Sequence, residues 1–289
     1  MKNKHSSIKR RRVIENTLVY IILTILCIVW LLPFAYIVLQ SFRKEPGAFL
    51  NYVFPKEFTL ENYEFLFISE YPYNFMDWYF NTLIIAVVTA VIQTILVLMV
   101  SYAFSRLRFK FRQKYMKLIL ILGMFPGFMS MIALYQILKI LKIETNIFSL
   151  ILIYCGSSAM NYYITKGFFD TIPYSLDEAA KIDGANENTI FFRVVLPLSK
   201  PIIVYTLLMA FIAPWGDYMF ASYLANGEPN MYNVAVGLSQ FIAAKDGMLN
   251  IHFKHFCAGA VFVSLPITIL FFCLQRYYVE GVTGGAVKG

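Results

Sequence analysis

Residues 175–201 read SLDEAAKIDGANENTIFFRVVLPLSKP, a polar stretch of both charge signs that interrupts a largely apolar chain. Ser175 and Glu178 have the spacing of a capping box, which predicts that a short helix begins at Ser175. Gly184 follows the polar end of that helix and predicts its stop, because glycine adopts the left-handed conformation after a helix at little cost. The stretch therefore begins with a short helix and a tight turn.

A second short helix is predicted directly after the turn. Asn186 or Asn188 can cap its start, and the dipeptide Leu196-Pro197 together with Pro201 closes it, because proline cannot continue a helix interior. The whole stretch is thus a compact helix–turn–helix between two hydrophobic spans.

The composition of the rest of the chain is that of a membrane protein. Of 289 residues, 59% are hydrophobic and only 15% are charged, with a mean hydropathy of +0.62, whereas a soluble protein carries about 25% charged residues. The net charge of +8 would suit a nucleic-acid partner, but the basic residues flank hydrophobic spans, where they set topology instead. We therefore predict an all-α polytopic membrane protein that binds the lipid bilayer and no nucleic acid.

Six transmembrane helices are predicted from the apolar runs, each near or above the roughly 17–25 residues needed to cross a bilayer. The first run is too long for a secretory signal and no cleavage site follows it, so it is expected to be retained. Residues 1–17 form an N-terminal segment, residues 18–279 the transmembrane domain and residues 280–289 a C-terminal tail. The six spans are residues 18–39, 78–104, 118–138, 147–165, 201–224 and 256–274.

Charge asymmetry predicts the orientation of these spans. Residues 106–117 carry six basic side chains and no acid, which indicates a cytoplasmic loop, whereas residues 45–77 carry more acids than bases and are expected outside. Because successive spans cross the membrane in alternate directions, both termini and the helix–turn–helix are then expected on the cytoplasmic side of the cell (inner) membrane.

The helix–turn–helix resembles the EAA signature of the membrane subunits of binding-protein-dependent ABC importers. The matching residues are Glu178-Ala179-Ala180, Gly184 and Leu196-Pro197, and the one departure is Val194 where the family has isoleucine. The resemblance implies a coupling helix that docks onto a separate ATPase subunit. The alternative is a solvated loop in which Glu178 only caps a helix. The residues expected at the ATPase are Glu178, Ala179, Ala180, Asp183, Gly184, Leu196 and Pro197.

Other segments extend the resemblance to maltose/maltodextrin-type permeases of the smaller, six-span kind. They include residues 58–63, FTLENY, and the tail of residues 275–289, QRYYVEGVTGGAVKG. The resemblance implies a heteromer with a larger permease subunit, an ATPase homodimer and an extracytoplasmic solute-binding protein. It also implies that the tail enters the ATPase interface; the alternative is a frayed terminus. The tail residues concerned are Gly284, Gly285, Lys288 and Gly289.

Motifs for chemistry within the chain are absent from the sequence. There is no G-x-x-x-x-G-K-[ST] loop, no H-E-x-x-H and no G-x-S-x-G. We therefore expect no catalytic residue, no metal and no cofactor in this chain, with ATP and magnesium bound by the partner ATPase. His252 and His255 could bind a metal, but without neighbouring cysteines or acids they are interpreted as solvated loop residues.

Four aromatic residues are candidates to line a substrate path, because aromatic faces suit sugar rings. The alternative is that they pack within the membrane domain. Trp215 precedes Gly216-Asp217, which differs from the Trp-Asn-Asp of the family and removes an amide there. The candidates are Tyr135, Tyr205, Trp215 and Tyr218.

These observations predict a non-enzymatic permease subunit of an ATP-driven importer for maltodextrin-like oligosaccharides. An ion-coupled carrier is the first rival, but the spans lack the buried acids, bases and histidines that such carriers use. An intramembrane enzyme is the second. Another oligosaccharide, a glycerol phosphate or a polyuronide remains open as the cargo.

Overall fold

The structure is a computed structural model that describes residues 2–48, 50–70, 72–124, 127–143, 146–243 and 248–284. These residues form helices joined by turns and loops, and their extended pairing is limited to an isolated bridge between Arg43 and Phe58. This confirms the predicted all-α class.

The chain divides into two compact units. The first comprises residues 1–68 and 241–262. It contains α1 (Lys2–Ser41), α2 (Glu61–Ile68) and the beginning of α14 (Met248–Gly284), which continues into the second unit. Apolar side chains lie exposed along α1, with Trp30 73% exposed. An exposed apolar helix of this length is what a bilayer-embedded segment requires.

Polar contacts fix the end of α1 within this unit. The Arg43 side chain is buried and donates hydrogen bonds to the Gln40 side chain and to the backbone oxygens of Glu45 and Gly47. Asn62 on α2 donates to the backbone oxygen of Arg43, 2.7 Å away. Buried polar groups must find such partners, so these contacts hold the loop between α1 and α2 in one conformation.

The interpretation of His252 and His255 as solvated loop residues is wrong. Both lie on α14, with their Nδ1 atoms 3.0 Å apart. His255 is 9% exposed and stacks on the ring of Phe65 with centroids 3.9 Å apart. The helix extends further toward the N-terminus than the apolar run that predicted it, and the rings pack as aromatic side chains. Within the described residues, no three metal-ligating side chains gather at one place.

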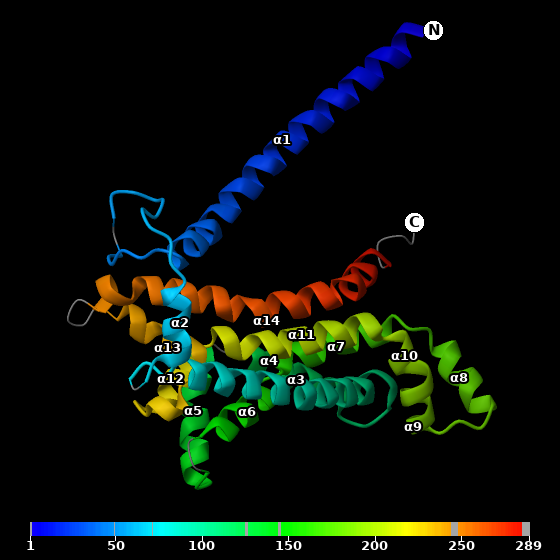
Figure 1. The fold of residues 1–289 in the computed structure, drawn as a ribbon. Helices are drawn as coiled ribbons and strands as arrows, with labels where there is room; N and C mark the ends of the chain where they lie inside the picture. Colours follow the sequence, from blue (N-terminus) through cyan, green and yellow to red (C-terminus); the bar gives the residue numbers. More distant parts are fainter. Residues whose placement is uncertain are drawn as a thin grey trace. The chain divides into compact units, whose positions relative to one another are not determined.

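The second unit comprises residues 69–240 and 263–289 and is organised around α3 (Phe75–Arg106). Figure 1 shows α3 running beside α7 and α11, the helices that it contacts most. Apolar residues recur through α3 together with a stripe of small polar ones, so the helix can be buried on several sides. The remaining elements of this unit are α4 (Arg112–Gly123), α5 (Gly127–Ile140), α6 (Ile147–Gly156), α7 (Ala159–Asp170), α8 (Tyr174–Ile182), α9 (Glu187–Ile190), a π-turn (Phe191–Val195), α10 (Leu196–Leu198), α11 (Lys200–Gly216), α12 (Met219–Ala225), a 3₁₀ turn (Pro229–Met231) and α13 (Val234–Ile242), whose last two residues belong to the first unit.

Helices long and apolar enough to cross a membrane occur three times in the described residues, at Arg12–Ser41, Phe75–Arg106 and Leu249–Tyr277. Two bent pairs also qualify when each is taken as one span. They are Ile147–Gly156 with Ala159–Asp170, bent by 44°, and Glu187–Leu198 with Lys200–Gly216, bent by 83°. The predicted span at residues 118–138 falls on α4 and α5, and residues 125–126 between them lie outside the described residues.

Candidate functional site

The helix–turn–helix predicted from residues 175–201 is present and forms one end of the second unit. We use the name elbow for residues 174–198, which comprise α8, α9, the π-turn and α10. In Figure 1 these elements lie beyond the ends of α3, α7 and α11. Ile190, Phe191 and Val195 of the elbow are buried in a cluster with Leu98 of α3 and Phe169 of α7.

The first helix of the elbow begins without the predicted capping box. Pro173 is the N-cap, at φ −58° and ψ 131°, and no side chain caps the helix. Since α8 begins at Tyr174, Ser175 already lies in its first turn and cannot be the N-cap. The predicted start at Ser175 and the capping role of Glu178 are therefore wrong. Proline fixes its own φ and leaves the following residue free to begin a helix.

The turn between α8 and α9 is built as the sequence predicts. Gly184 has φ +84°, its amide donates to the Lys181 oxygen at 3.0 Å, and the Ala185 amide donates to the Ala180 oxygen at 2.9 Å. This is the hydrogen-bond pattern of a Schellman motif. The Asn186 side chain then accepts from the Thr189 amide at 2.8 Å and caps α9.

Gly184→Ala is expected to destabilise the protein by about 1 kcal/mol, because an L-residue is disfavoured at positive φ. A Cβ atom at this position would meet open space, so backbone conformation alone sets the cost. Gly184→Asn should cost less, since asparagine tolerates this conformation better. Thermal unfolding of the three proteins in detergent measures the order. An equal loss of stability in the alanine and asparagine variants would show that a factor other than the positive φ requires glycine at this position.

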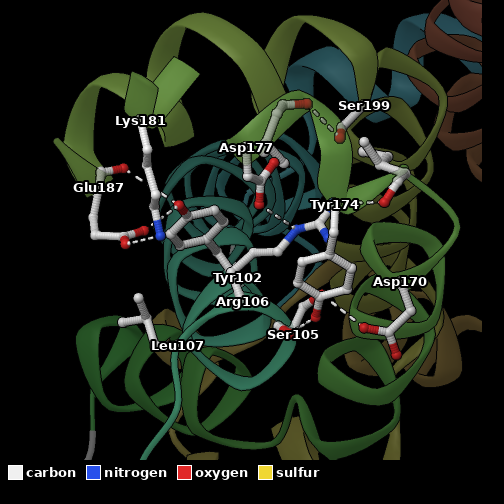
Figure 2. Close-up of polar contacts among 12 residues, drawn as sticks. Tyr102, Ser105, Arg106, Leu107, Asp170, Tyr174, Asp177, Lys181, Glu187 and Ser199 are labelled. Carbon is white, nitrogen blue, oxygen red and sulfur yellow. Dashed lines mark hydrogen bonds and ion pairs between the residues drawn. The ribbon is translucent and has the colours of Figure 1, made fainter. Parts of the chain in front are cut away.

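A buried ion pair joins the elbow to the end of α3 (Figure 2). Arg106 is the last residue of α3, and its Nε lies 3.3 Å from Oδ2 of Asp177 on α8. The two side chains are only 2% and 8% exposed. The guanidinium also donates from Nη2 to the Ile172 oxygen at 2.8 Å and lies 4.2 Å from the centre of the Tyr174 ring. These contacts attach the start of α8 to α3 from three directions.

Hydrogen bonds extend this attachment on both sides, as Figure 2 shows. The Tyr174 hydroxyl donates to the backbone oxygen of Ser105 at 2.6 Å. The Ser105 hydroxyl in turn donates to the Asp170 carboxylate of α7 at 2.7 Å. On the other side, Tyr102 of α3 donates to the Glu187 carboxylate at 3.1 Å. Residues 102–106 at the end of α3 therefore contact both helices of the elbow and the end of α7.

A second ion pair joins the two helices of the elbow, α8 and α9. Lys181 Nζ of α8 lies 2.7 Å from Glu187 Oε1 of α9, and both side chains are about half exposed. An ion pair in this setting contributes little stability by itself, because solvent screens the two charges. Its place is nevertheless informative, since Glu187 also accepts from Tyr102. The two helices of the elbow and α3 thus share one polar network.

Burial raises the pKa of the Asp177 carboxyl, and the Arg106 guanidinium and Lys181 ammonium oppose part of that rise. Among the described residues, Asp177 Oδ1 and Arg106 Nη1 are buried without a hydrogen-bond partner. Desolvation of both charges therefore offsets much of their attraction. The pair is better understood as a fixed connection between α3 and α8 than as a large source of stability.

The opposite face of α8 is exposed and mixed in character. Glu178 and Ala179 are exposed, Ile182 is 87% exposed, and Leu176 is 41% exposed. This face of α8 therefore presents leucine and isoleucine side chains beside a carboxylate, and its role at an ATPase stays a prediction. Ala180 is half-buried and packs against the cluster beneath the elbow.

The last predicted docking residues lie near the junction with α11. Leu196 packs against the same cluster, and Pro197 is exposed in the short α10. The bend of 83° follows at Ser199, whose hydroxyl donates to the Val195 oxygen at 2.7 Å. Pro201 lies in the first turn of α11, where a missing amide costs nothing. The two prolines therefore bracket the bend.

The four candidate path residues are not brought together by any contact that the structure describes. Tyr135 packs edge-on against Tyr223, with ring centroids 5.1 Å apart, in a cluster of α3, α6 and α12 residues. Tyr205 packs at the elbow cluster instead. Trp215 is 4% exposed and Tyr218 is 51% exposed. Their role in a substrate path stays a prediction.

The tail is described only in part. Gly284 is the last residue of α14, while Gly285, Lys288 and Gly289 lie outside the described residues. The contact of the tail with an ATPase therefore stays a prediction as well.

Sequence reasoning missed the residues that attach the elbow. The sequence indicates Arg106 only as one of the basic residues of a cytoplasmic loop, and it assigns no role to Asp177. An arginine that ends an apolar span is one available signal, and an aspartate directly before the signature glutamate is another. Neither indicates that the two side chains meet. The residues missed are Tyr102, Ser105, Arg106, Tyr174, Asp177, Lys181 and Glu187.

Three comparisons relate the chain to known proteins. The family model described as the binding-protein-dependent transport system inner membrane component matches residues 102–284. The galactooligosaccharides transport system permease protein GanQ of Bacillus subtilis is 34% identical, over 98% of this chain and 99% of its own. The maltodextrin transport system permease protein MalD of Streptococcus pneumoniae is 36% identical, over 99% of this chain and all of its own.

A solved structure shares the fold. It belongs to a bacterial ABC transporter involved in the import of the acidic polysaccharide alginate. It matches with a TM-score of 0.76 and 23% identity, over 92% of this chain and 96% of the other.

Proposed function

The chain belongs to the family of binding-protein-dependent transport system inner membrane components, and from this membership we propose that it forms, with a second permease, the path of an ATP-driven oligosaccharide importer. The chain is a permease subunit, and the proposal assigns its cargo and its coupling. One observation carries the coupling. The elbow exposes Glu178 on one face, while Arg106 and Asp177 attach its other face to α3.

The cargo proposal rests on the relatives. Two full-length relatives at 34% and 36% identity are named for galactooligosaccharides and for maltodextrin, which are both neutral oligosaccharides. A maltodextrin-like oligosaccharide is therefore the proposed substrate class. The partners are a larger permease, an ATPase homodimer that binds ATP and magnesium, and an extracytoplasmic solute-binding protein.

Coupling in this proposal is mechanical. The ATPase closes on nucleotide, and the exposed face of α8 moves with it. Because the buried pair and the Tyr174 contacts attach α8 to α3, the end of α3 moves with the elbow as one body. The cluster beneath the elbow includes residues of α3, α7 and α11, so the displacement reaches three helices of the second unit.

The proposed orientation places the elbow and both termini in the cytoplasm. The support is the run of basic residues at 106–117, directly after α3 and beside the elbow. A loop facing the cytoplasm is also the only one that an ATPase could reach. Cysteine labelling of a Glu178→Cys variant in whole cells, by a membrane-impermeant reagent, tests this. Labelling from outside would overturn the orientation and the coupling together.

The experiment for the proposed function is reconstitution of the complex in liposomes. The purified membrane subunits should bind the ATPase, and the solute-binding protein with maltodextrin should stimulate ATP hydrolysis and uptake. Ligand identification on the solute-binding protein decides among cargoes. Uptake by this chain alone without ATP would instead support an ion-coupled carrier. Failure of the membrane subunits to bind any ATPase would contradict the proposal.

A further inference from the structure

A groove between α4 and α7 is lined by both basic and apolar side chains, from Arg112 at the start of α4 to Leu120 about two turns further along. It encloses about 380 Å³, and none of its lining residues belongs to α8. Its α4 residues occupy one helical face, and its α7 residues are one turn apart, so both walls are set by regular backbone. Its basic lining is Arg112, Lys117 and Lys166, and its apolar lining is Met116, Leu120 and Tyr163.

Positive charge continues from this groove along the loop before α4. A second hollow of about 760 Å³ is lined by Arg108, Lys110 and Lys114 and shares Arg112 with the groove. The sequence from residue 106 to 143 contains no acid. Arg106 is neutralised by Asp177, whereas the other basic residues of the loop lack such an acid within their own segment.

Two groups of the groove are held in place. Arg112 Nη1 donates to the backbone oxygens of Ser105 and Leu107, at 3.3 Å each. Lys166 pairs with Asp170, which also accepts a hydrogen bond from Ser105. Lys117 is exposed. The basic lining therefore combines an oriented guanidinium, the exposed ammonium group of Lys117 and the ammonium group of Lys166, which also pairs with Asp170. Such a donor set suits a phosphate diester.

The length of the groove matches an amphipathic ligand. The α4 lining runs from Arg112 to Leu120, which is about 12 Å along a helix at 1.5 Å per residue. Arg112 begins the helix, and the run from Leu118 onward is apolar, so we place Arg112 at the membrane surface and Leu120 deeper. Exposed Phe111, Tyr115 and Tyr163 surround this level, as aromatic residues do at an interface.

We propose that this groove binds an anionic phospholipid, with the phosphate at Arg112, Lys117 and Lys166 and an acyl chain along Met116 and Leu120. Basic residues that only set topology need to lie near the membrane, but they do not need a groove with apolar lining. A free phosphate or an acidic protein would use the charge alone. A lipid of negative headgroup uses both the basic and the apolar lining, and basic pockets between membrane helices suit such headgroups.

This inference depends on the chain residing in a membrane and not on the ATPase partner or the cargo. Its failure is therefore distinguishable from failure of the proposed function. The test uses the purified full-length chain in detergent, with phosphatidylglycerol or phosphatidylcholine added, and native mass spectrometry counts the retained lipids. Phosphatidylglycerol is expected to be retained in preference. Each basic residue near a headgroup strengthens binding about fivefold.

The double variant Lys117→Gln/Lys166→Gln should lower the affinity for phosphatidylglycerol about 25-fold, as two such factors combine. The matched control Lys139→Gln/Lys200→Gln removes two exposed charges outside the groove and should bind as the unmodified chain does. Lys117→Gln alone, at an exposed position, gives the same direction if the double variant folds poorly.

Three outcomes would overturn the proposal. Equal retention of the two lipids would show that the negative headgroup is not recognised. An unchanged affinity in both the single and the double variant would place the lipid elsewhere. Displacement of phosphatidylglycerol by inorganic phosphate, with no loss on replacing Leu120 by alanine, would identify a free phosphate site instead.

Discussion

Replacing Glu178 with alanine is expected to leave the chain folded in the membrane and to abolish substrate-stimulated ATP hydrolysis by the assembled importer. The side chain is exposed, and its carboxylate forms no hydrogen bond or ion pair within the described part of the chain. Its removal therefore costs the isolated subunit little. At a desolvated interface with a basic partner, the same loss costs roughly 3–5 kcal/mol.

The structure removes the competing explanation for this result. Since Pro173 is the N-cap of α8 and no side chain caps it, Glu178 cannot act through a capping box. Glu178→Gln keeps the shape and removes the charge, so it separates electrostatic from steric docking. Ser175→Ala, at an exposed position in the first turn of α8, is the matched control and should retain coupling. Normal stimulation in Glu178→Ala would refute an interfacial role.

The second large effect is expected from Arg106→Met. This change leaves Asp177 buried without its counterion and removes the donor to the Ile172 oxygen. Loss of one member of a buried pair costs roughly 3–5 kcal/mol. In a chain of this size that lowers the unfolding temperature by on the order of 10 °C. Thermal unfolding in detergent measures the loss. Proteolysis should also cut the elbow more readily, because α8 is no longer attached to α3.

The pH dependence of this loss has a definite sign. Burial already raises the pKa of Asp177, and removing Arg106 raises it further. A carboxyl whose folded pKa exceeds its unfolded pKa favours folding below the unfolded value, and this contribution is lost as pH rises through the folded value. The deficit of Arg106→Met should therefore be smaller at mildly acidic pH than at alkaline pH.

A double variant provides the control. Arg106→Met/Asp177→Leu removes both charges and should recover most of the lost stability, because apolar replacements of a buried pair are often neutral. If the single and double variants unfold at the same temperature, the pair is not what the single change disrupts. If the double variant is stable and yet uncoupled, the charges themselves are needed for transmission.

The parts of the elbow that local chemistry determines could be predicted from sequence. Gly184 requires a left-handed turn and Asn186 offers a cap, and both are found as predicted. The predicted start of α8 is wrong because two competing helix-start signals lie close together in the sequence. Ser175 matches a capping pattern, but Pro173 ends the extended segment two residues earlier, and the helix begins at Tyr174.

The attachment of the elbow could not be predicted, because it depends on residues that are distant in the chain. Arg106 and Asp177 meet only once α3 and α7 have packed together. The error at His252 and His255 has the same origin. Hydropathy places both histidines outside a predicted span. In the structure they lie on α14, and the ring of His255 packs against Phe65. Periodicity reports which residues are apolar, but not which polar residues find partners.

In the proposed coupling, the bend of 83° between residues 187–198 and α11 would turn a displacement of the elbow into a rotation of α11. Because α11 continues for 17 residues, it is about 25 Å long, and a turn of about 5° at Ser199 would carry its far end through about 2 Å. Under this proposal, a small rotation at Ser199 would displace the other end of α11 by about 2 Å. The rigidity of the bend at Ser199, rather than the size of the displacement at the elbow, would then limit how far the other end of α11 moves.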